Sequence, residues 1–259
     1  MCLVLIAHHA CRGYPLIVVA NRDEFHARAT ATAGWWTDHP DVFGGRDLDA
    51  GGTWLAVDRT GRFATLTNVR SGTPTRARPR SRGLLLKDFL TGSSSARRFL
   101  DVLAADADDY AGFNMLTRDQ EALCWLSNYG GPQQTLTPGI YTVSNALLDT
   151  PWPKAERLKQ RFLRVMQEPG DDLAESLLRI LCDHQRPADD SLPQTGIGLA
   201  AERALSSVFI SGEHYGTRCS TVVLIDDRNR LHFYERSFDH RARVTEDVRV
   251  AFELAEPAP

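Results

Sequence analysis

The order of short apolar runs, most of them joined in pairs by tight turns, is the feature that most constrains the fold of this 259-residue chain. Short runs rich in Val, Ile and Leu between turn residues are typical of strands. We expect strands at Leu3–Ala7, Pro15–Ala20, Thr53–Asp58, Arg62–Asn68, Phe113–Arg118, Ala122–Ser127, Ile140–Ser144, Cys219–Ile225 and Arg230–Glu235, with an edge strand at Val248–Leu254. Helical spacing of apolar residues predicts helices at Leu84–Leu90, Ala96–Ala105, Pro153–Gln167 and Leu173–Cys182.

Strands paired by hairpins and interrupted by pairs of helices do not build a doubly wound parallel sheet. They favour an α+β fold, in which mainly antiparallel sheets carry helices on their outer faces. The sequence contains no internal repeat and no segment with the composition of a linker. We therefore expect a single domain over residues 1–259.

Composition narrows the classes of partner. The net charge of −3 gives no reason to expect nucleic acid or an anionic membrane as the main partner. No apolar run approaches the ~20 residues that span a bilayer, and no basic region precedes the first apolar stretch as in a secretory signal. The five cysteines are odd in number, scattered and without CxxC spacing, which favours reduced thiols in the cytoplasm and no structural metal. We expect no cofactor.

Cys2 directly follows the initiator methionine and opens the first apolar run. Removal of Met1 would leave one residue with both a thiol and a free α-amine. An α-amine has a pKa of about 7.7–8.0, so it can accept the thiol proton near neutral pH. Nucleophile and base would then belong to one residue. The alternative is that Cys2 is only a small apolar residue in a buried strand, and if Met1 is retained the self-activation is lost.

Several polar residues stand where apolar strands end, and strand ends are common positions for functional sites. These residues are Asn21, Arg22, Asp23, Glu24, Asn68, Asn145 and Arg218. Each has a structural alternative, because a buried Asp–Arg pair can be a structural ion pair and a strand-end asparagine can satisfy turn backbone.

The segment from Arg70 to Arg82 combines arginines with prolines and glycines, which excludes a helix interior. We favour a solvated surface loop over a lid that attracts an anionic ligand.

Three further features have two interpretations each. His8 and His9 should point to opposite faces of their strand, one buried and one exposed; the alternatives are that one faces the site near Cys2, or ligates a metal or haem. His214 lies in a loop or lines a pocket. Trp35 and Trp36 pack in the core or form an aromatic wall for an apolar ligand.

The Met1–Cys2 start and the run Asn21-Arg22-Asp23-Glu24 together resemble the NRDE-motif family, also called the transport and Golgi organisation protein 2 family. Other segments are similar to that family as well: Phe43–Asp47, Gly51–Ala56, Leu66–Arg70, Tyr141–Asn145 and Thr217–Val222. The similarity runs over nearly the whole chain. Each motif is short, but their combination is specific.

That family is related to the N-terminal nucleophile hydrolases that act on linear amides such as penicillin V and conjugated bile salts. The resemblance implies a four-layer αββα sandwich. It also implies that Cys2 is the nucleophile, and that Asp23 with Arg22 orients the α-amine and thiol. The bile-salt enzymes space these residues differently, so Glu24 remains an alternative to Asp23 as the inward carboxylate.

The resemblance also extends to later parts of the chain. It implies that Asn68 and Asn145 stabilise an oxyanion or face the substrate, and that Arg218 lies near the nucleophile. Trp54, within the Gly51–Ala56 motif, and His214 are the expected substrate contacts, together with Glu24.

Two functions remain open from the sequence. In the first, Cys2 attacks the carbonyl of a small linear amide or related acyl substrate, forms a thioester, and water releases the acid. In the second, implied by the family's association with haem mobilisation and secretion, the protein binds or transports haem or another hydrophobic ligand without turning it over.

Overall fold

The computed structural model describes residues 2–72 and 80–256, which form two antiparallel sheets. The strands of the six-stranded sheet, in spatial order, are β10 (Gly139–Val143), β1 (Cys2–Cys11), β2 (Tyr14–Phe25), β11 (Tyr215–Ile225), β12 (Arg230–Phe238) and β13 (Val244–Glu253). Those of the seven-stranded sheet are β3 (Thr30–Trp35), β4 (Val42–Asp47), β5 (Leu55–Asp58), β6 (Phe63–Asn68), β7 (Phe113–Arg118), β8 (Leu123–Ser127) and β9 (Gln134–Leu136).

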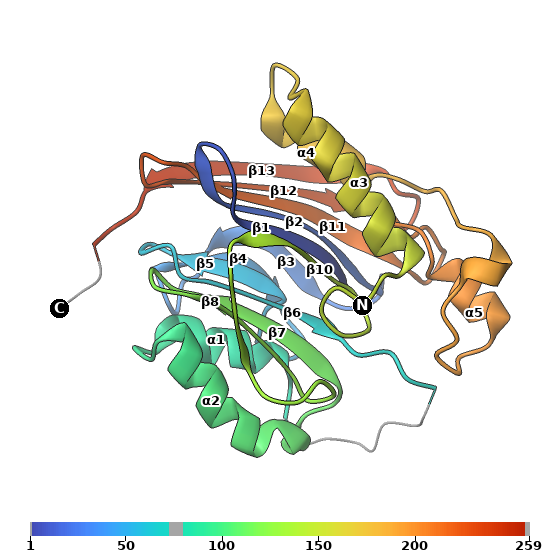
Figure 1. The fold of residues 1–259 in the computed structure, drawn as a ribbon, viewed down its shortest axis with the longest axis horizontal. Coiled ribbons are helices and arrows are strands. Elements are labelled where there is room, and N and C mark those ends of the chain that lie inside the picture. The colour runs from blue at the N-terminus through green and yellow to red at the C-terminus, as the bar shows by residue number, and fades with distance from the viewer. Residues whose placement is uncertain (1, 73–79, 257–259) are drawn as a thin grey trace.

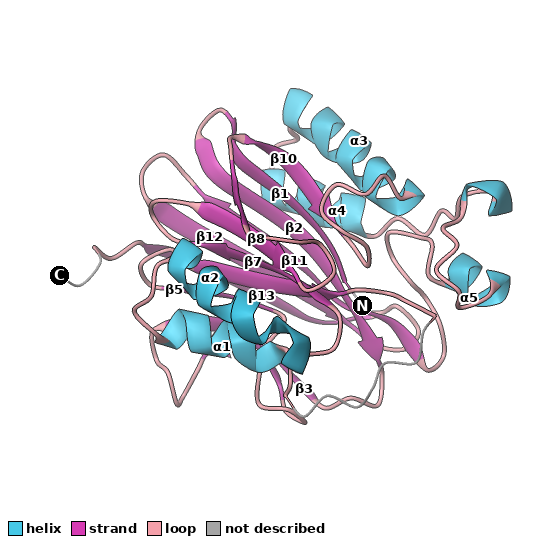
Figure 2. Ribbon diagram, turned by 60° about the horizontal axis from the view of Figure 1, so that its bottom comes forward, coloured by secondary structure: helices cyan, strands magenta, loops and turns pink. Residues whose placement is uncertain are grey.

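The helices are α1 (Gly83–Thr91), α2 (Ala96–Asp106), α3 (Pro153–Gln167), α4 (Leu173–Leu181) and α5 (Leu199–Ala204), with 3₁₀ turns at Ala107–Asp109 and Asp189–Ser191. Helices α1 to α4 cover the outer faces of both sheets, and α5 lies to one side of them (Figures 1 and 2). Helices α3 and α4 lie on the six-stranded sheet, and α1 and α2 on the seven-stranded sheet. The expected four-layer αββα sandwich is therefore confirmed.

Alternation along β1 and β2 explains how one sheet contributes to two apolar layers. Val4 and Val18 pack between the sheets, whereas Leu3, Leu5 and Val19 pack beneath α3 and α4. Successive side chains of a strand point to opposite faces, so each strand is apolar on both sides. This periodicity also fixes the direction of the polar residues that follow on the same strands.

The structure departs from the predicted elements in places that matter for the site. Strand β2 continues to Phe25, so the polar run that begins at Asn21 lies within a strand and not after its end. Strands β3 and β4 were not predicted, because Gly34, Gly44 and Gly45 interrupt their apolar pattern. Helix α5 lies in a segment for which no element was predicted.

Trp35 and Trp36 both pack against the core, as in the first of the two interpretations. Trp36 is buried against α1 and α2, and Trp35 packs against Phe43 and Phe252. None of the helices in the described ranges is both long enough and apolar enough to cross a bilayer.

Candidate active site

Cys2 is the first residue of β1 and pairs with Arg22 on β2. Arg22 in turn pairs with Cys219 on the other neighbouring strand, β11. Alternation with Val4 directs the Cys2 side chain between the two sheets, where it is only 9% exposed. The thiol thus lies at the end of the inter-sheet core.

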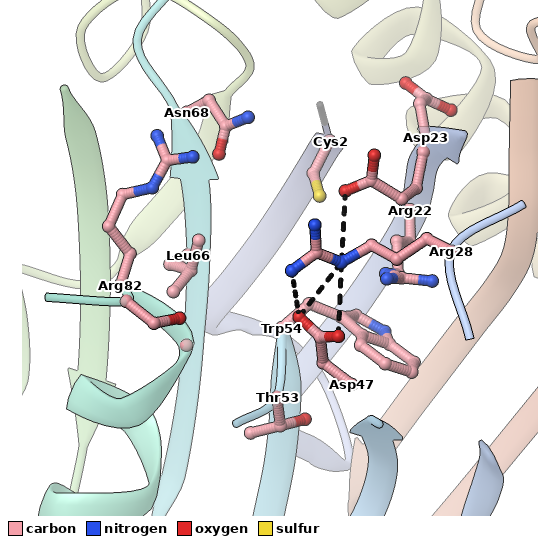
Figure 3. A pocket seen from close by; sticks show the side chains of 13 residues that line it. Cys2, Arg22, Asp23, Arg28, Asp47, Thr53, Trp54, Leu66, Asn68 and Arg82 are labelled. Carbon is pink, nitrogen blue, oxygen red and sulfur yellow. Dashed lines mark hydrogen bonds and ion pairs between the residues drawn. The ribbon is translucent and has the colours of Figure 1, made fainter. Parts of the chain in front are cut away.

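A small polar cavity of about 100 Å³ opens beside this thiol (Figure 3). Its lining residues are Cys2, Arg22, Asp23, Glu24, Arg28, Asp47, Thr53, Trp54, Leu66, Asn68, Ser81, Arg82 and Gly83. The Cys2 sulfur points into the cavity, between Arg28 on one side and Asn68 and Arg82 on the other. Six of the nine sequence-predicted residues line this space, which we call the Cys2 cavity: Cys2, Arg22, Asp23, Glu24, Trp54 and Asn68.

Arg22 and Trp54 connect the two sheets at the base of the Cys2 cavity. The Arg22 guanidinium lies 4.1 Å from the centroid of the Trp54 ring, and its Nη1 donates to Thr30 Oγ1 at 3.1 Å. Both side chains are buried. A guanidinium stacked on an aromatic face is held in place while its charge remains available to a neighbour.

Asp23 points to the other face of the sheet, towards α3, and is 1% exposed. Its Oδ1 accepts from Thr217 Oγ1 at 2.7 Å, and its backbone carbonyl accepts from the Tyr215 hydroxyl at 2.9 Å. Burial raises the pKa of Asp23, while the charges of Lys154 and Arg22 act to lower it. Of the two carboxylates left open by the sequence, Asp23 is therefore the deeply buried one.

Burial also raises the pKa of the Cys2 thiol, and the negative charge of Asp23 acts in the same direction. The guanidinium of Arg22 and the backbone amide of Asp23 oppose this rise. The thiol is thus a buried group whose ionisation depends on the charges around it.

Glu24 belongs to a different charge cluster. Arg28 donates to Asp47 Oδ2 from Nη2 at 2.7 Å and from Nε at 3.1 Å. Its Nε also lies 4.0 Å from Glu24 Oε2. Sequence reasoning missed Arg28 and did not single out Asp47. Asp47 lies within a family-like motif, whereas Arg28 follows the strand in a turn that gave no signal.

Asn145 supports the Cys2 cavity without lining it. Its Nδ2 donates to the Asn68 carbonyl at 3.1 Å, and its Oδ1 accepts from Ser144 Oγ at 3.3 Å. The Ser144 hydroxyl also lies 3.3 Å from the Cys2 carbonyl oxygen. Asn145 is fully buried and forms part of a separate groove of about 520 Å³ beside α3.

Arg218 and His214 lie outside the Cys2 cavity. Arg218 Nη1 donates to the carbonyls of Phe25 and Arg28, and its side chain lines a neighbouring cavity of about 230 Å³ together with Arg22. His214 is exposed in the loop before β11. His8 is buried and His9 is exposed, at the end of β1 remote from Cys2.

The first and last arginines of the predicted surface loop contact the protein, whereas Ser71, Gly72 and Arg80 are exposed. The Arg70 side chain is 5% exposed, pairs with Glu202 at 2.7 Å and stacks on Trp152. Arg82 is half-buried in the Cys2 cavity and donates to the Gly112 carbonyl at 2.7 Å. Residues 73–79 of the predicted loop lie outside the described ranges.

Lys154 is the most notable charged residue that sequence reasoning missed. It lies in the first turn of α3, is 3% exposed, and its Nζ donates to Asn145 Oδ1 at 3.4 Å. A signal was available, because Lys154, Leu158 and Phe162 follow one another at intervals of four residues. A lysine on the apolar stripe of a helix must find buried partners.

Comparison with known proteins gives a consistent result. A family model described as "Transport and Golgi organisation 2" matches residues 1–240. The human "Transport and Golgi organization protein 2 homolog" is 34% identical over 240 residues, covering 86% of this chain and 87% of the relative. The Drosophila melanogaster "Transport and Golgi organization protein 2" is 32% identical over 250 residues, covering 87% of each.

Among solved structures, a Caenorhabditis elegans orthologue of N-acylethanolamine-hydrolyzing acid amidase matches 86% of this chain and 92% of its own. The TM-score is 0.52 at 10% sequence identity. At that identity the likeness concerns the fold alone, and it agrees with the four-layer αββα sandwich.

Proposed function

This chain belongs to the transport and Golgi organisation 2 family, and from the surroundings of its second residue we propose that it is a cysteine N-terminal nucleophile hydrolase of a small linear amide or related acyl compound. One observation carries the proposal: the Cys2 sulfur points into a polar cavity whose wall includes the Arg22 guanidinium and the strand end at Asn68. A thiol, a nearby cation and amide donors are the groups that acyl transfer requires.

In the proposed reaction, removal of Met1 frees the α-amine of Cys2, which accepts the thiol proton. The thiolate attacks the amide carbonyl carbon, and donors at the Asn68 strand end stabilise the oxyanion. The C–N bond breaks as the α-ammonium returns its proton to the leaving amine, which leaves a thioester. Water, deprotonated by the α-amine, then attacks the thioester and releases the acid with a regenerated thiol.

The neighbouring groups have supporting roles in this proposal. Arg22 favours the thiolate through its charge and is held by Trp54. Asp23 orients and balances the charge of the α-ammonium. Glu24 lines the entrance as a substrate contact. Because the Cys2 cavity holds about 100 Å³, against roughly 300–1,000 Å³ for typical ligand pockets, it accommodates the reacting group and leaves the rest of the substrate outside.

The test combines mass and reactivity. Untagged protein should lack the mass of Met1 and should be acylated at Cys2 by a thiol-directed acyl probe, while an amide and lactone panel identifies substrates. Cys2→Ala should abolish labelling and turnover. Cys182→Ala is the matched control, because that thiol is half-buried and belongs to α4's C-terminal end, and it should leave both unchanged. Labelling that persists in Cys2→Ala would refute the proposal.

A second candidate function has its own observation. The groove of about 520 Å³ beside Asn145 has apolar walls that include Leu147, Pro151 and Trp152, and it could hold a hydrophobic ligand such as haem. Haem and a fluorescent fatty acid should then bind with a Soret shift or an emission change. Leu147→Asp should weaken this binding, whereas Leu163→Asp, at another exposed leucine, should not. Absence of both signals in the unaltered protein would exclude this function.

A further inference from the structure

Lys154 occupies an unusual position for a lysine. The chain has 30 basic residues, of which only Lys87, Lys154 and Lys159 are lysines. Lys154 is nevertheless almost completely buried, in the first turn of an outer helix. Burial of an ammonium in an apolar layer is strongly unfavourable unless charges and hydrogen bonds compensate it. The position of Lys154 therefore requires an electrostatic explanation.

The groups that face Lys154 come from several elements packed against α3. Its ammonium interacts favourably with Asp23 of β2, with Cys2 of β1 and with Glu202 of α5, and unfavourably with Arg70 after β6. Glu202 is itself paired with Arg70 at 2.7 Å. That pairing leaves Asp23 as the first among the charges that favour the ammonium form of Lys154.

The interaction is reciprocal at Asp23. Among the charges around Asp23, which include those of Arg22 and Lys154, that of Lys154 has the largest effect in favour of the carboxylate. Neither charge is hydrated, because both groups are buried. Burial therefore lowers the pKa of Lys154 to about 8 and raises the pKa of Asp23. Each of these buried charges thus depends on the other.

A hydrogen bond to Asn145 connects Lys154 to the wall of the Cys2 cavity. Nζ donates to Asn145 Oδ1, and the same amide group donates through Nδ2 to the carbonyl of Asn68. With its oxygen held by the ammonium, the Asn145 amide has one orientation in which its nitrogen faces Asn68. The outer helix is thereby connected to the strand end that borders the Cys2 cavity.

We propose that Lys154 is a positioning residue of the Cys2 site, whose ammonium keeps the Asp23 carboxylate ionised and fixes the Asn145 amide against the strand end at Asn68. Its importance for catalysis rests on the proposed hydrolase function. The electrostatic interaction with Asp23 and the hydrogen bond to Asn145 do not depend on that function, and both can be tested without any substrate.

The experiment follows the Asp23 carboxyl directly. Protein labelled with ¹³C at the aspartate carboxyl carbons is titrated by NMR, and the Asp23 signal is assigned by its loss in Asp23→Asn. We expect Asp23 to be ionised at neutral pH in the unaltered protein. In Lys154→Met its titration midpoint should rise by about 1–3 pH units, the range expected for loss of one close opposite charge. Lys154→Arg should retain most of the effect.

Two variants separate this role from a merely structural one. Lys154→Gln is neutral but can still hydrogen-bond Asn145, so it should raise the midpoint as Lys154→Met does and serves if the methionine variant does not fold. Lys159→Met, on the same helix, should leave the midpoint unchanged. A midpoint that stays constant in the neutral Lys154 variants, or an Asp23 that is protonated in the unaltered protein at neutral pH, overturns the proposal.

The outcome is independent of the hydrolase test. Acylation at Cys2 with a constant Asp23 midpoint would support the hydrolase and refute the role of Lys154. A shifted midpoint with no acylation at Cys2 would support the role of Lys154 and refute the hydrolase.

Discussion

At the scale of single residues, the shape of the Cys2 cavity depends on a glycine that touches none of the proposed reacting groups. A Cβ at Gly45 of β4 would overlap the outer ring atoms of Trp54, the side chain on which Arg22 stacks. Trp54 is buried and cannot move outwards freely. Gly45 therefore fixes the position of the Arg22 guanidinium indirectly.

Gly45→Ala should destabilise the protein by about 1–3 kcal/mol, because it overpacks a buried aromatic contact. It should also slow acylation of Cys2, since displacement of Trp54 moves Arg22 away from the thiol. Urea unfolding and the labelling rate measure the two effects. Gly34→Ala is the matched control on the neighbouring strand β3, where a Cβ meets no atom within 4 Å. Equal effects of the two substitutions would contradict this explanation.

Some residues of the candidate site could be predicted from the sequence, and others could not. Cys2 was predicted from its position after Met1, and Arg22 and Asp23 from the contiguous run Asn21–Glu24; the strand register then pairs Cys2 with Arg22. Arg28 and Lys154 were not predicted, because their roles come from contacts between elements that are distant in sequence. The placement of Arg218 in a neighbouring cavity depends on a shift in strand register between Thr217 and Cys219. No local sequence pattern predicts this shift.

At the scale of elements, α3 carries Lys154 and is fastened to the end of α4 by one carboxylate. Asp183 accepts from Arg157 Nε at 2.5 Å and from Arg161 Nη1 at 3.0 Å, and its own side chain is 6% exposed. Its other oxygen accepts from the Gln185 amide. The register of α3 over the sheet, and hence the depth of Lys154, depends on this contact.

Asp183→Asn should weaken the docking of α3, because two arginines lose their shared charged acceptor. The expected loss of stability is about 1–3 kcal/mol, with faster amide hydrogen exchange in α3 than in α1. Asp189→Asn is the control, because Asp189 and Arg203 form a similar pair on the surface, where such pairs contribute little. If both substitutions give the same exchange pattern, Asp183 does not hold α3.

The elements themselves were predictable where the apolar period was uninterrupted. The hairpin of β11 and β12 and the helix α3 were predicted within a few residues. Strands β3 and β4 were missed because glycines interrupt their apolar pattern; in β4, Gly44 and Gly45 are required by close approach to the β5 backbone and to Trp54, which strand propensity does not reflect. These two segments form strands because of tertiary contacts, which cannot be read from a local sequence pattern.

At the scale of the whole molecule, we propose that residues 1–259 form one domain. The six-stranded sheet joins strands from the start, middle and end of the chain, since β1 lies between β10 and β2, and β2 pairs with β11. No cut through the sequence separates the two sheets into independent halves. Unfolding should then follow a single transition, and the ionisation of one buried group should affect global stability.

Lys154 provides such a link between pH and stability. Its pKa is about 8 in the folded chain, lowered from 10.5 by burial. Between these values the unfolded chain binds more protons, so the free energy of unfolding rises with pH, and this contribution is lost as pH falls through 8. Relative to Lys154→Met, the unaltered protein should therefore gain up to about 1.4 kcal/mol per pH unit across that window.

Urea unfolding of both proteins at pH values inside and on either side of this window measures the difference. Taking the difference removes contributions from tyrosines and other groups that the two proteins share. Lys159→Met should run parallel to the unaltered protein at every pH, because it leaves the buried ammonium in place. A constant difference between the unaltered protein and Lys154→Met would mean that Lys154 keeps its proton throughout the window, which would contradict a pKa lowered to about 8 by burial.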